Sequence, residues 1–217
     1  MPILGISASG RQNGITGEVV KAVLQASGEQ HEYLSLADMR INGCDGCTLC
    51  GADNRCRLKD DWIEIGEKMV AADAIVFGAP NYFGYVNGLA HACWERTFCF
   101  RHREVFRLAG KLGVVVAVDG GEQNSSVLQY IRYMMGRNMM VVVDSVYAEG
   151  YSQCYTCGFG EDCAVGGVVK RHGFLDRIEA QHLPPRLEGQ ETGSFQAYRA
   201  GKTIGSILRA RRGNAER

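Results

Sequence analysis

Residues 74–80 read AIVFGAP and residues 111–119 read KLGVVVAVD. Both are near-continuous apolar runs, which is typical of strands buried on both faces of a parallel sheet. Further strands are expected at 2–7 (PILGIS), 31–36 (HEYLSL) and 139–147 (MMVVVDSVY). Longer amphipathic stretches separate these runs. The pattern therefore predicts an α/β fold in which helices cover a five-stranded, doubly wound parallel sheet.

Helical periodicity is expected in five stretches: 14–28, 60–73, 88–100, 122–138 and 193–210. In the first two, the spacing predicts buried apolar side chains, namely Val19, Val20, Val23, Leu24, Ile63, Met69 and Val70. Residues 148–192 are rich in Gly and Cys and lack a clear period. We expect them to form an arm, or insertion, between the last strand and the last helix. The last helix and a basic tail would then occupy residues 193–217.

Composition narrows the class of protein. The 217 residues suit one domain, and 24 Lys and Arg balance 24 Asp and Glu, so no nucleic-acid partner is expected. No apolar run approaches the roughly 18 residues of a membrane span, so no membrane partner is expected either. The start MPILGISASG lacks the charged region of a signal peptide. A cytoplasmic location follows as an expectation, and nine cysteines in a reducing compartment indicate metal or redox chemistry rather than disulfides.

Ligands of open parallel sheets bind beyond the carboxyl ends of the strands, where three loops are expected. The first, SASGRQNGIT (7–16), has neither a G-x-G-x-x-G fingerprint nor a Walker lysine. It does offer Ser9, Arg11, Asn13 and Thr16 at the start of a helix. Such donors suit a phosphate group, and ordinary N-capping is the alternative.

The other two loops suit a flat ligand. The loop GAPNYFGYVNG (78–88) carries Tyr82, Phe83 and Tyr85, which either stack on a ring or pack on the neighbouring helix. The loop VDGGEQNSS (118–126) has paired glycines that permit close approach of the backbone to a ligand, or form a plain turn.

Four of the nine cysteines lie in CDGCTLCGADNRC (44–56), spaced C-x2-C-x2-C-x5-C. Closely spaced thiolates of this kind wrap one iron–sulfur cubane, whereas structural zinc prefers two separated C-x2-C pairs. The spacing favours a cluster over zinc, and free redox-active thiols are the third interpretation.

A second group, CYTCGFGEDC (154–163), provides only Cys154, Cys157 and Cys163. A second metal site would need a fourth ligand from His172, another cysteine or a second subunit. Free thiols are the alternative. Cys93 and Cys99 are expected to be packing residues, and Trp62 and Trp94 to lie in the core or an interface.

Taken together, the three loops resemble those of the flavodoxin-like NAD(P)H-dependent FMN reductases. The cysteine cluster followed by Asp60-Asp61-Trp62 is similar to the iron–sulfur flavoprotein branch of that family. The resemblance covers about residues 2–147 and implies the flavodoxin-like strand order 2-1-3-4-5, with residues 1–147 as the FMN-binding domain and 43–58 as its cysteine loop. It also implies FMN bound by Ser9, Arg11, Asn13, Ile15, Thr16, Pro80, Asn81, Tyr82, Phe83, Gly84, Asp119, Gly120 and Gly121, and a [4Fe–4S] cluster bound by Cys44, Cys47, Cys50 and Cys56.

The implied function is that of a redox flavoprotein. FMN and a [4Fe–4S] cluster would transfer electrons between an acceptor and either NAD(P)H or a one-electron carrier such as ferredoxin. Two alternatives stay open: an NAD(P)H-dependent FMN or quinone reductase without a cluster, and a non-enzymatic electron carrier or redox sensor. The resemblance further implies a homodimer or homotetramer.

Overall fold

The computed structural model describes residues 3–121 and 126–215 of the chain. Five parallel strands form one sheet in the order β2-β1-β3-β5-β6. This confirms the predicted flavodoxin-like order. The strands are β1 (Ile3–Ser7), β2 (His31–Ser35), β3 (Ala74–Tyr82), β5 (Leu112–Asp119) and β6 (Val141–Glu149).

A short strand that the sequence did not predict, β4 (Tyr85–Val86), pairs antiparallel with the end of β3. The two residues of the connecting turn, Phe83 and Gly84, have φ values of 53° and 79°. Positive φ at both positions is the geometry of a tight hairpin turn whose twist matches the strands. The second predicted loop is therefore a hairpin and not an irregular segment.

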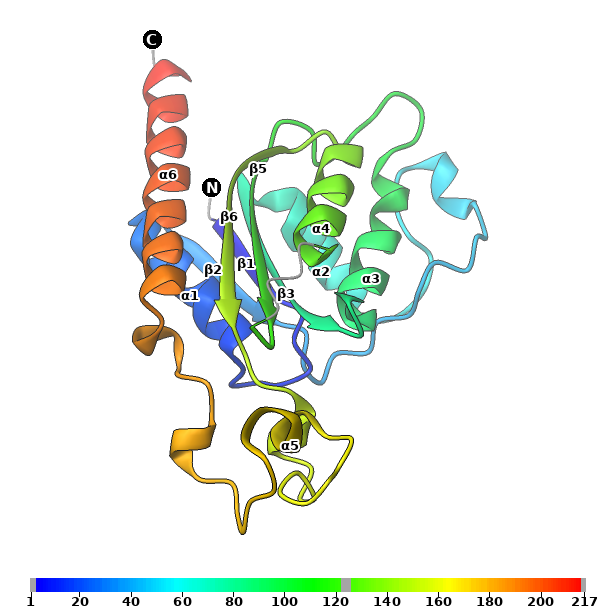
Figure 1. The fold of residues 1–217 in the computed structure, drawn as a ribbon. Coiled ribbons are helices and arrows are strands. Elements are labelled where there is room, and N and C mark those ends of the chain that lie inside the picture. The colour runs from blue at the N-terminus through cyan, green and yellow to red at the C-terminus, as the bar shows by residue number, and fades with distance from the viewer. Residues whose placement is uncertain (1–2, 122–125, 216–217) are drawn as a thin grey trace.

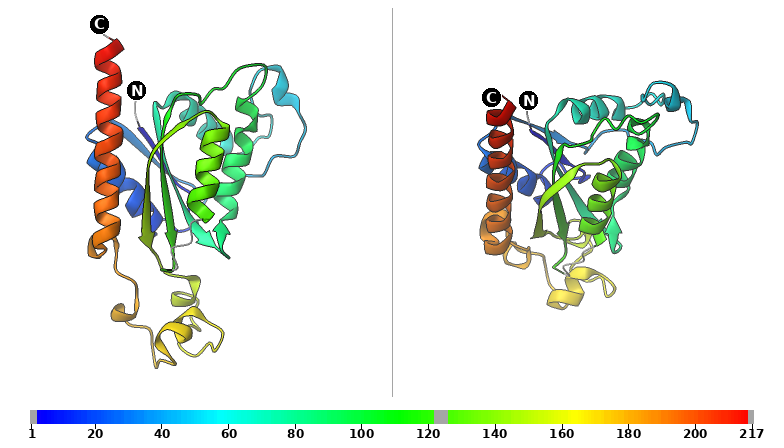
Figure 2. Two further views of the ribbon diagram at one scale, coloured as in Figure 1. Left: turned by 45° about the horizontal axis from the view of Figure 1, so that its top comes forward. Right: turned by 90° about the horizontal axis from the view of Figure 1, so that it is seen from above.

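The helices cover both faces of the sheet, as Figures 1 and 2 show. On one face lie α1 and α6, and on the other lie α2, α3 and α4. Each face buries its own apolar cluster, as expected of a parallel sheet. The helices are α1 (Ile15–Ser27), α2 (Trp62–Ala71), α3 (Gly88–Glu95), α4 (Ser126–Arg137), α5 (Gly167–His172) and α6 (Glu191–Ala215), and the 3₁₀ turns are η1 (Leu49–Ala52), η2 (Arg96–Phe100), η3 (Gln153–Tyr155), η4 (Ala180–His182) and η5 (Leu187–Gly189).

Several boundaries differ from the sequence prediction. The helix expected over 88–100 becomes a 3₁₀ turn at Arg96, and the last strand begins two residues later than expected, at Val141. The start of the helix expected at 122 lies outside the described residues. Ile63 and Val70 are only partly buried, because the core-facing stripe of α2 comprises Trp62, Ile65, Gly66 and Met69. The other predicted core positions are buried, namely Val19, Val20, Val23, Leu24, Met69, Trp62, Trp94, Cys93 and Cys99.

Figures 1 and 2 also locate the two cysteine-rich segments. Residues 43–58 form a loop on the side of the molecule that carries α3. The predicted arm, 148–192, is shorter than expected, since β6 ends at Glu149 and α6 begins at Glu191; the arm between them extends beyond the carboxyl ends of the strands and contains the short helix α5. No helix in the described part of the chain is long and apolar enough to cross a membrane.

Helix α6 approaches α1 closely at two glycines. A Cβ atom on Gly205 would lie 2.2 Å from the carbonyl oxygen of Ser27, and one on Gly201 would lie 2.5 Å from that of Val23. Backbone atoms cannot yield as a flexible side chain would. Glycine at these positions is therefore what allows the two helices to pack at this distance.

We expect Gly205→Ala to lower the free energy of unfolding by about 1–3 kcal/mol, because the methyl group overpacks the α1–α6 contact. Urea unfolding of the two proteins measures the difference. Gly213→Ala on the same helix is the matched control, since nothing lies within 4 Å of its added Cβ. It should be stabilising by about 0.5–1 kcal/mol through helix propensity. Equal effects of the two substitutions would contradict the packing argument.

Candidate functional site

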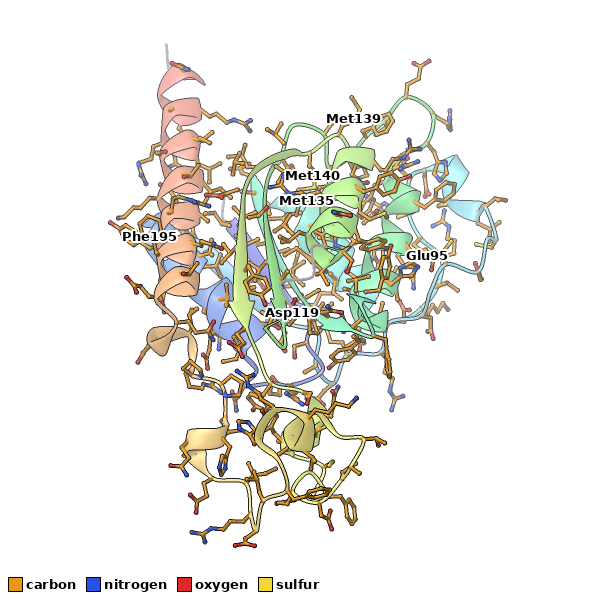
Figure 3. All side chains as sticks on the ribbon, in the orientation of Figure 1. Glu95, Asp119, Met135, Met139, Met140 and Phe195 are labelled. Carbon is orange, nitrogen blue, oxygen red and sulfur yellow. The ribbon has the colours of Figure 1, made fainter. Side chains whose placement is uncertain are left out.

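A pocket opens at the carboxyl ends of the strands, where ligands bind in this architecture. Four segments contribute to it: the loop after β1, the end of β3, the end of β5 and the segment after β6. Asp119 marks the place in Figure 3, at the end of β5 and next to the arm. The lining residues are Ser9, Arg11, Gly14, Ile15, Thr16, Pro80, Asn81, Tyr82, Val118, Asp119, Gly120, Gly150, Tyr151, Ser152 and Gln153.

The loop after β1 presents hydrogen-bond donors to the pocket. Ser9 and Thr16 are buried, and the Ser9 hydroxyl accepts a hydrogen bond from the Arg11 N–H at 3.1 Å. Gly14 is the N-cap of α1, and no side chain within the described residues caps this helix. Because Gly14 and Ile15 line the pocket, the positive end of the α1 dipole lies at the pocket wall.

Arg11 supplies the charge at this end of the pocket. Its Nη1 donates to the carbonyl oxygen of Tyr151 at 2.9 Å, and its guanidinium lies 4.7 Å from the centre of the Tyr151 ring. Its Nη2 is buried and has no hydrogen-bond partner among the described residues. A buried donor without a partner is rare in proteins. The open helix start and this free donor fit a phosphate group.

The second loop is tied to the first through Asn87. This buried side chain donates from Nδ2 to the carbonyl oxygen of Ala8 at 2.7 Å. Asn81 lines the pocket, and its Oδ1 is buried without a partner in the part of the chain that the structure describes. A free acceptor in a pocket that Tyr82 also lines suits a planar ligand that carries N–H groups, as a flavin ring does.

The third loop is held by Asp119. Its Oδ1 accepts hydrogen bonds from the N–H of Gly121, at 2.9 Å, and from the hydroxyl of Tyr147. Residues 122–125 of this loop lie outside the described residues.

Four of the residues implied for FMN do not line the pocket. Asn13 is exposed and lies outside the lining, as do the hairpin residues Phe83 and Gly84 and the turn residue Gly121. Phe83 is fully exposed at the tip of the hairpin. The other nine implied residues do line it: Ser9, Arg11, Ile15, Thr16, Pro80, Asn81, Tyr82, Asp119 and Gly120.

Sequence reasoning missed the segment 150–153, which forms one wall of the pocket. The N–H of Gly150 donates to the carbonyl oxygen of Asp119 at 2.6 Å, and a Cβ atom on Gly150 would lie 2.6 Å from Val118 Cγ1. This segment follows the fifth parallel strand. The rule that ligands bind at carboxyl ends of strands would have found it, had it been applied to that strand as well.

The cysteine loop is fastened to the body of the protein by Arg96. This side chain is fully buried (0% exposed) and forms a two-pronged ion pair with Asp60 (3% exposed), at 2.7 and 3.1 Å. It also donates to the carbonyl oxygen of Asn42 at 2.9 Å and, from Nε, to the Cys56 sulfur at 3.2 Å. One guanidinium therefore joins the residues before and after the four cysteines.

Burial alone would raise the pKa of Asp60. The hydrogen bonds from Arg96 and Asn42 outweigh burial and hold that pKa below its ordinary value. The pair is consequently ionised at neutral pH, which keeps the loop anchored.

Two further contacts hold the loop. The carboxylate of Glu95, which is labelled in Figure 3, accepts a hydrogen bond from the Cys44 N–H at 2.9 Å. The Cys50 sulfur lies 3.1 Å from His102 Nε2. Cys50 is buried, Cys56 is half-buried, and Cys44 and Cys47 are exposed.

Cys50 lies within electrostatic range of the other three thiols of the loop. Burial raises the pKa of Cys50, and the negative charges of Cys56, Cys47 and Cys44 raise it further. Across the described residues, however, no three His, Cys, Asp or Glu side chains already lie in positions to bind one metal ion. The donor set, four thiols on one anchored loop, is the type that binds an iron–sulfur cluster.

Cys93 and Cys99 behave differently. Burial raises the pKa of both thiols to about 12, so they stay protonated at neutral pH. Protonated, buried thiols act as small apolar side chains. The structure thus confirms their packing role.

Comparisons with known proteins agree with this geometry. The family model described as NADPH-dependent FMN reductase matches residues 1–153. An iron–sulfur flavoprotein of Methanocaldococcus jannaschii is 36% identical over 151 residues, which are 67% of this chain and 77% of the relative. An iron–sulfur flavoprotein of Methanosarcina thermophila is 30% identical over 156 residues, 69% of this chain and 81% of the relative.

Solved structures share the fold at low sequence identity. RosB, solved with the intermediate 8-demethyl-8-formylriboflavin-5′-phosphate, has a TM-score of 0.68 and 14% identity over 97% of this chain and 79% of its own. An NAD(P)H:quinone oxidoreductase from Methanothermobacter marburgensis has a TM-score of 0.58 and 15% identity over 94% of this chain and 96% of its own.

The three loop motifs, the strand order and the pocket they form thus coincide with a family match that spans residues 1–153 of the 217. The chain belongs to the NADPH-dependent FMN reductase family, and it is an FMN-dependent oxidoreductase similar to iron–sulfur flavoproteins.

Proposed function

We propose that the chain binds FMN in the pocket at the carboxyl ends of the strands and a [4Fe–4S] cluster on Cys44, Cys47, Cys50 and Cys56. It would transfer electrons between an acceptor and either NAD(P)H or a one-electron carrier such as ferredoxin. FMN supplies one- and two-electron chemistry and the cluster one-electron chemistry. The residues of the chain bind, orient and tune these groups.

The observation that carries the flavin proposal is the buried, unpartnered Nη2 of Arg11 beside an uncapped helix start. Arg11 and the hydroxyls of Ser9 and Thr16 would hold the phosphate. Pro80, Asn81 and Tyr82 would hold the ring and the ribityl chain, together with Asp119 and Gly120, which also line the pocket. Because these residues come from three separate loops, the ligand would bind only when the sheet edge is assembled.

Two features support the cluster proposal: the four-thiol spacing, and the buried ion pair that fixes both ends of the loop. The hydrogen bond from Arg96 to the Cys56 sulfur places a positive charge beside a ligand thiolate. Hydrogen bonds to cluster sulfurs are one of the means by which proteins tune the reduction potential.

A second candidate is an NAD(P)H-dependent FMN or quinone reductase without a cluster. It is favoured by the finding that, in the described residues, no three side chains are arranged to bind one metal ion. In this alternative the loop would carry free thiols or zinc.

The fully exposed Phe83 and the half-exposed Tyr85 lie on the hairpin that follows the pocket residue Tyr82, and they support a homodimer or homotetramer. Large exposed apolar side chains next to a binding site are typical of an interface. In such an assembly the hairpin of one subunit would lie against another subunit, so Phe83 and Gly84 could still approach the flavin ring.

The electron donor is identified by anaerobic reduction of the purified protein, followed at the absorption band of the flavin. We expect NADPH, NADH or a reduced ferredoxin to reduce the flavin in one rapid phase. In the variant Cys47→Ser/Cys50→Ser, reduction by NAD(P)H should persist and reduction by ferredoxin should slow. Equal rates with ferredoxin in both proteins would support the reductase without a cluster. Failure of every donor would contradict the proposed activity.

A further inference from the structure

The arm is an ordered segment almost without an apolar core. Within residues 151–183, all of which the structure describes, Val168 is the single apolar side chain that is fully buried. Large apolar side chains of the arm face outward instead: Phe159 is 73% exposed, Val165 81% and Phe174 70%. Hydrophobic burial therefore does not account for the fold of this segment.

Segments of this size seldom fold on apolar burial alone. Below about 40 residues, disulfides, a bound metal or association with another chain are usually needed. The three cysteines of the arm are free thiols in the structure. Polar contacts hold the arm, among them the Arg171–Glu149 ion pair and the hydrogen bond between Tyr155 and His172, and its three free thiols are candidate metal ligands.

The sequence of the arm repeats the spacing of the first cysteine loop. Residues 47–56 read CTLCGADNRC and residues 154–163 read CYTCGFGEDC. Both fit C-x2-C-G-x4-C, including the glycine after the second cysteine. The first loop has one more cysteine, Cys44, three residues before this repeat begins. Tyr151 occupies the equivalent position before Cys154.

Two of the three sulfur atoms of the arm lie beside one turn, although no three His, Cys, Asp or Glu side chains of the described residues are already placed to bind one metal ion. The N–H of Gly167 donates to the Cys154 sulfur at 3.3 Å, and the Cys163 sulfur lies 3.3 Å from where a Cβ of Gly166 would be. The Cys157 sulfur lies 3.5 Å from the carbonyl oxygen of Cys154. Two adjacent glycines leave space beside the sulfurs that side chains would fill.

We propose that Cys154, Cys157 and Cys163 bind a second iron–sulfur cluster, which orders the arm beside the flavin pocket. Three thiolates leave one position of a cubane to a non-cysteine ligand. Cys154 follows directly after Gln153, a residue of the pocket wall, so the cluster would lie next to the pocket. The match to the FMN reductase family ends at residue 153 and does not include these cysteines.

Iron and acid-labile sulfide, assayed on anaerobically purified full-length protein, test this inference. We expect about eight irons per chain in the wild type, as two cubanes require, and about four in the variant Cys154→Ser/Cys157→Ser/Cys163→Ser. Cys93→Ala is the matched control, because this buried thiol lies outside both motifs. It should retain the iron content of the wild type.

Limited trypsin digestion provides a second readout that does not depend on activity. Lys170, Arg171 and Arg177 are exposed within the arm. We expect cleavage after them to be at least tenfold faster in the triple variant than in the wild type, while FMN content stays unchanged. Cys157→Ser alone replaces an exposed thiol, so a loss of about four irons in this single variant would not be due to misfolding of the core.

Three results would overturn the inference: a wild type with about four irons, a triple variant with the same iron content as the wild type, or zinc bound to the arm in place of iron. The variant Cys47→Ser/Cys50→Ser separates this inference from the proposed function. If that variant keeps all its iron, the assignment of the first cluster to Cys44–Cys56 is wrong. The inference about the arm is tested separately, by the difference in iron content between the wild type and the arm triple variant.

Discussion

Replacing Arg96 by leucine is expected to lower the free energy of unfolding by about 3–5 kcal/mol, because Asp60 is left as a buried charge without its partner. The guanidinium is completely buried and contacts Asp60, Asn42 and the Cys56 sulfur. We also expect the iron content to fall, since the two ends of the cysteine loop are no longer joined. Urea unfolding and iron assay of the anaerobic protein measure the two effects.

The control for Arg96→Leu is Arg199→Ala. Arg199 forms an ion pair with Asp144 at 2.6 Å, but its side chain is 48% exposed. Such surface pairs contribute about 0–1 kcal/mol, so a small effect is expected. In addition, Arg96→Met combined with Asp60→Leu should recover part of the lost stability, because no charge is then left buried. An Arg96→Leu protein as stable as the Arg199→Ala protein would contradict the anchoring role.

Replacing Arg11 by leucine is expected to weaken FMN binding by about 10- to 150-fold. The lost interaction is a hydrogen bond to a charged group, which contributes about 1.5–3 kcal/mol. The physical basis is the buried Nη2, which lacks a partner within the described residues. Titration of flavin-depleted protein with FMN, followed by quenching of flavin fluorescence, measures the dissociation constant.

Two comparisons make the Arg11 prediction specific. Gln12→Ala changes the neighbouring residue, which is exposed and donates to Asp38, and should leave FMN affinity unchanged. Riboflavin lacks the phosphate, so its affinity should differ little between the wild type and Arg11→Leu. An equal loss for riboflavin and FMN would mean that Arg11 shapes the pocket without contacting the phosphate.

Much of the fold could be predicted from the sequence, because strands buried on both faces leave a direct apolar signature. The runs at 74–80 and 111–119 correspond to β3, the central strand of the sheet, and to β5, which lies next to it. The hairpin strand β4 was missed, since it depends on positive φ at Phe83, a conformation that a phenylalanine does not indicate. The helix expected over 88–100 becomes a 3₁₀ turn at Arg96, the residue whose side chain forms the buried ion pair with Asp60.

The candidate site could be predicted only where it is continuous in the sequence. Nine residues implied by the loop motifs do line the pocket. The wall formed by residues 150–153 could have been predicted from the strand before it, because this wall directly follows the parallel strand β6. The contact of Arg96 with Cys56 could not, because it joins residues 40 positions apart, and no local pattern specifies such a contact.

The most direct test of the account is the FMN, iron and sulfide content of anaerobically purified wild type and of Cys47→Ser/Cys50→Ser. We predict about one FMN per chain in both proteins, and a loss of about four irons and four sulfides in the variant. Unchanged iron in the variant, or a wild type without FMN, would contradict the assignment of Cys44–Cys56 or of the pocket, respectively.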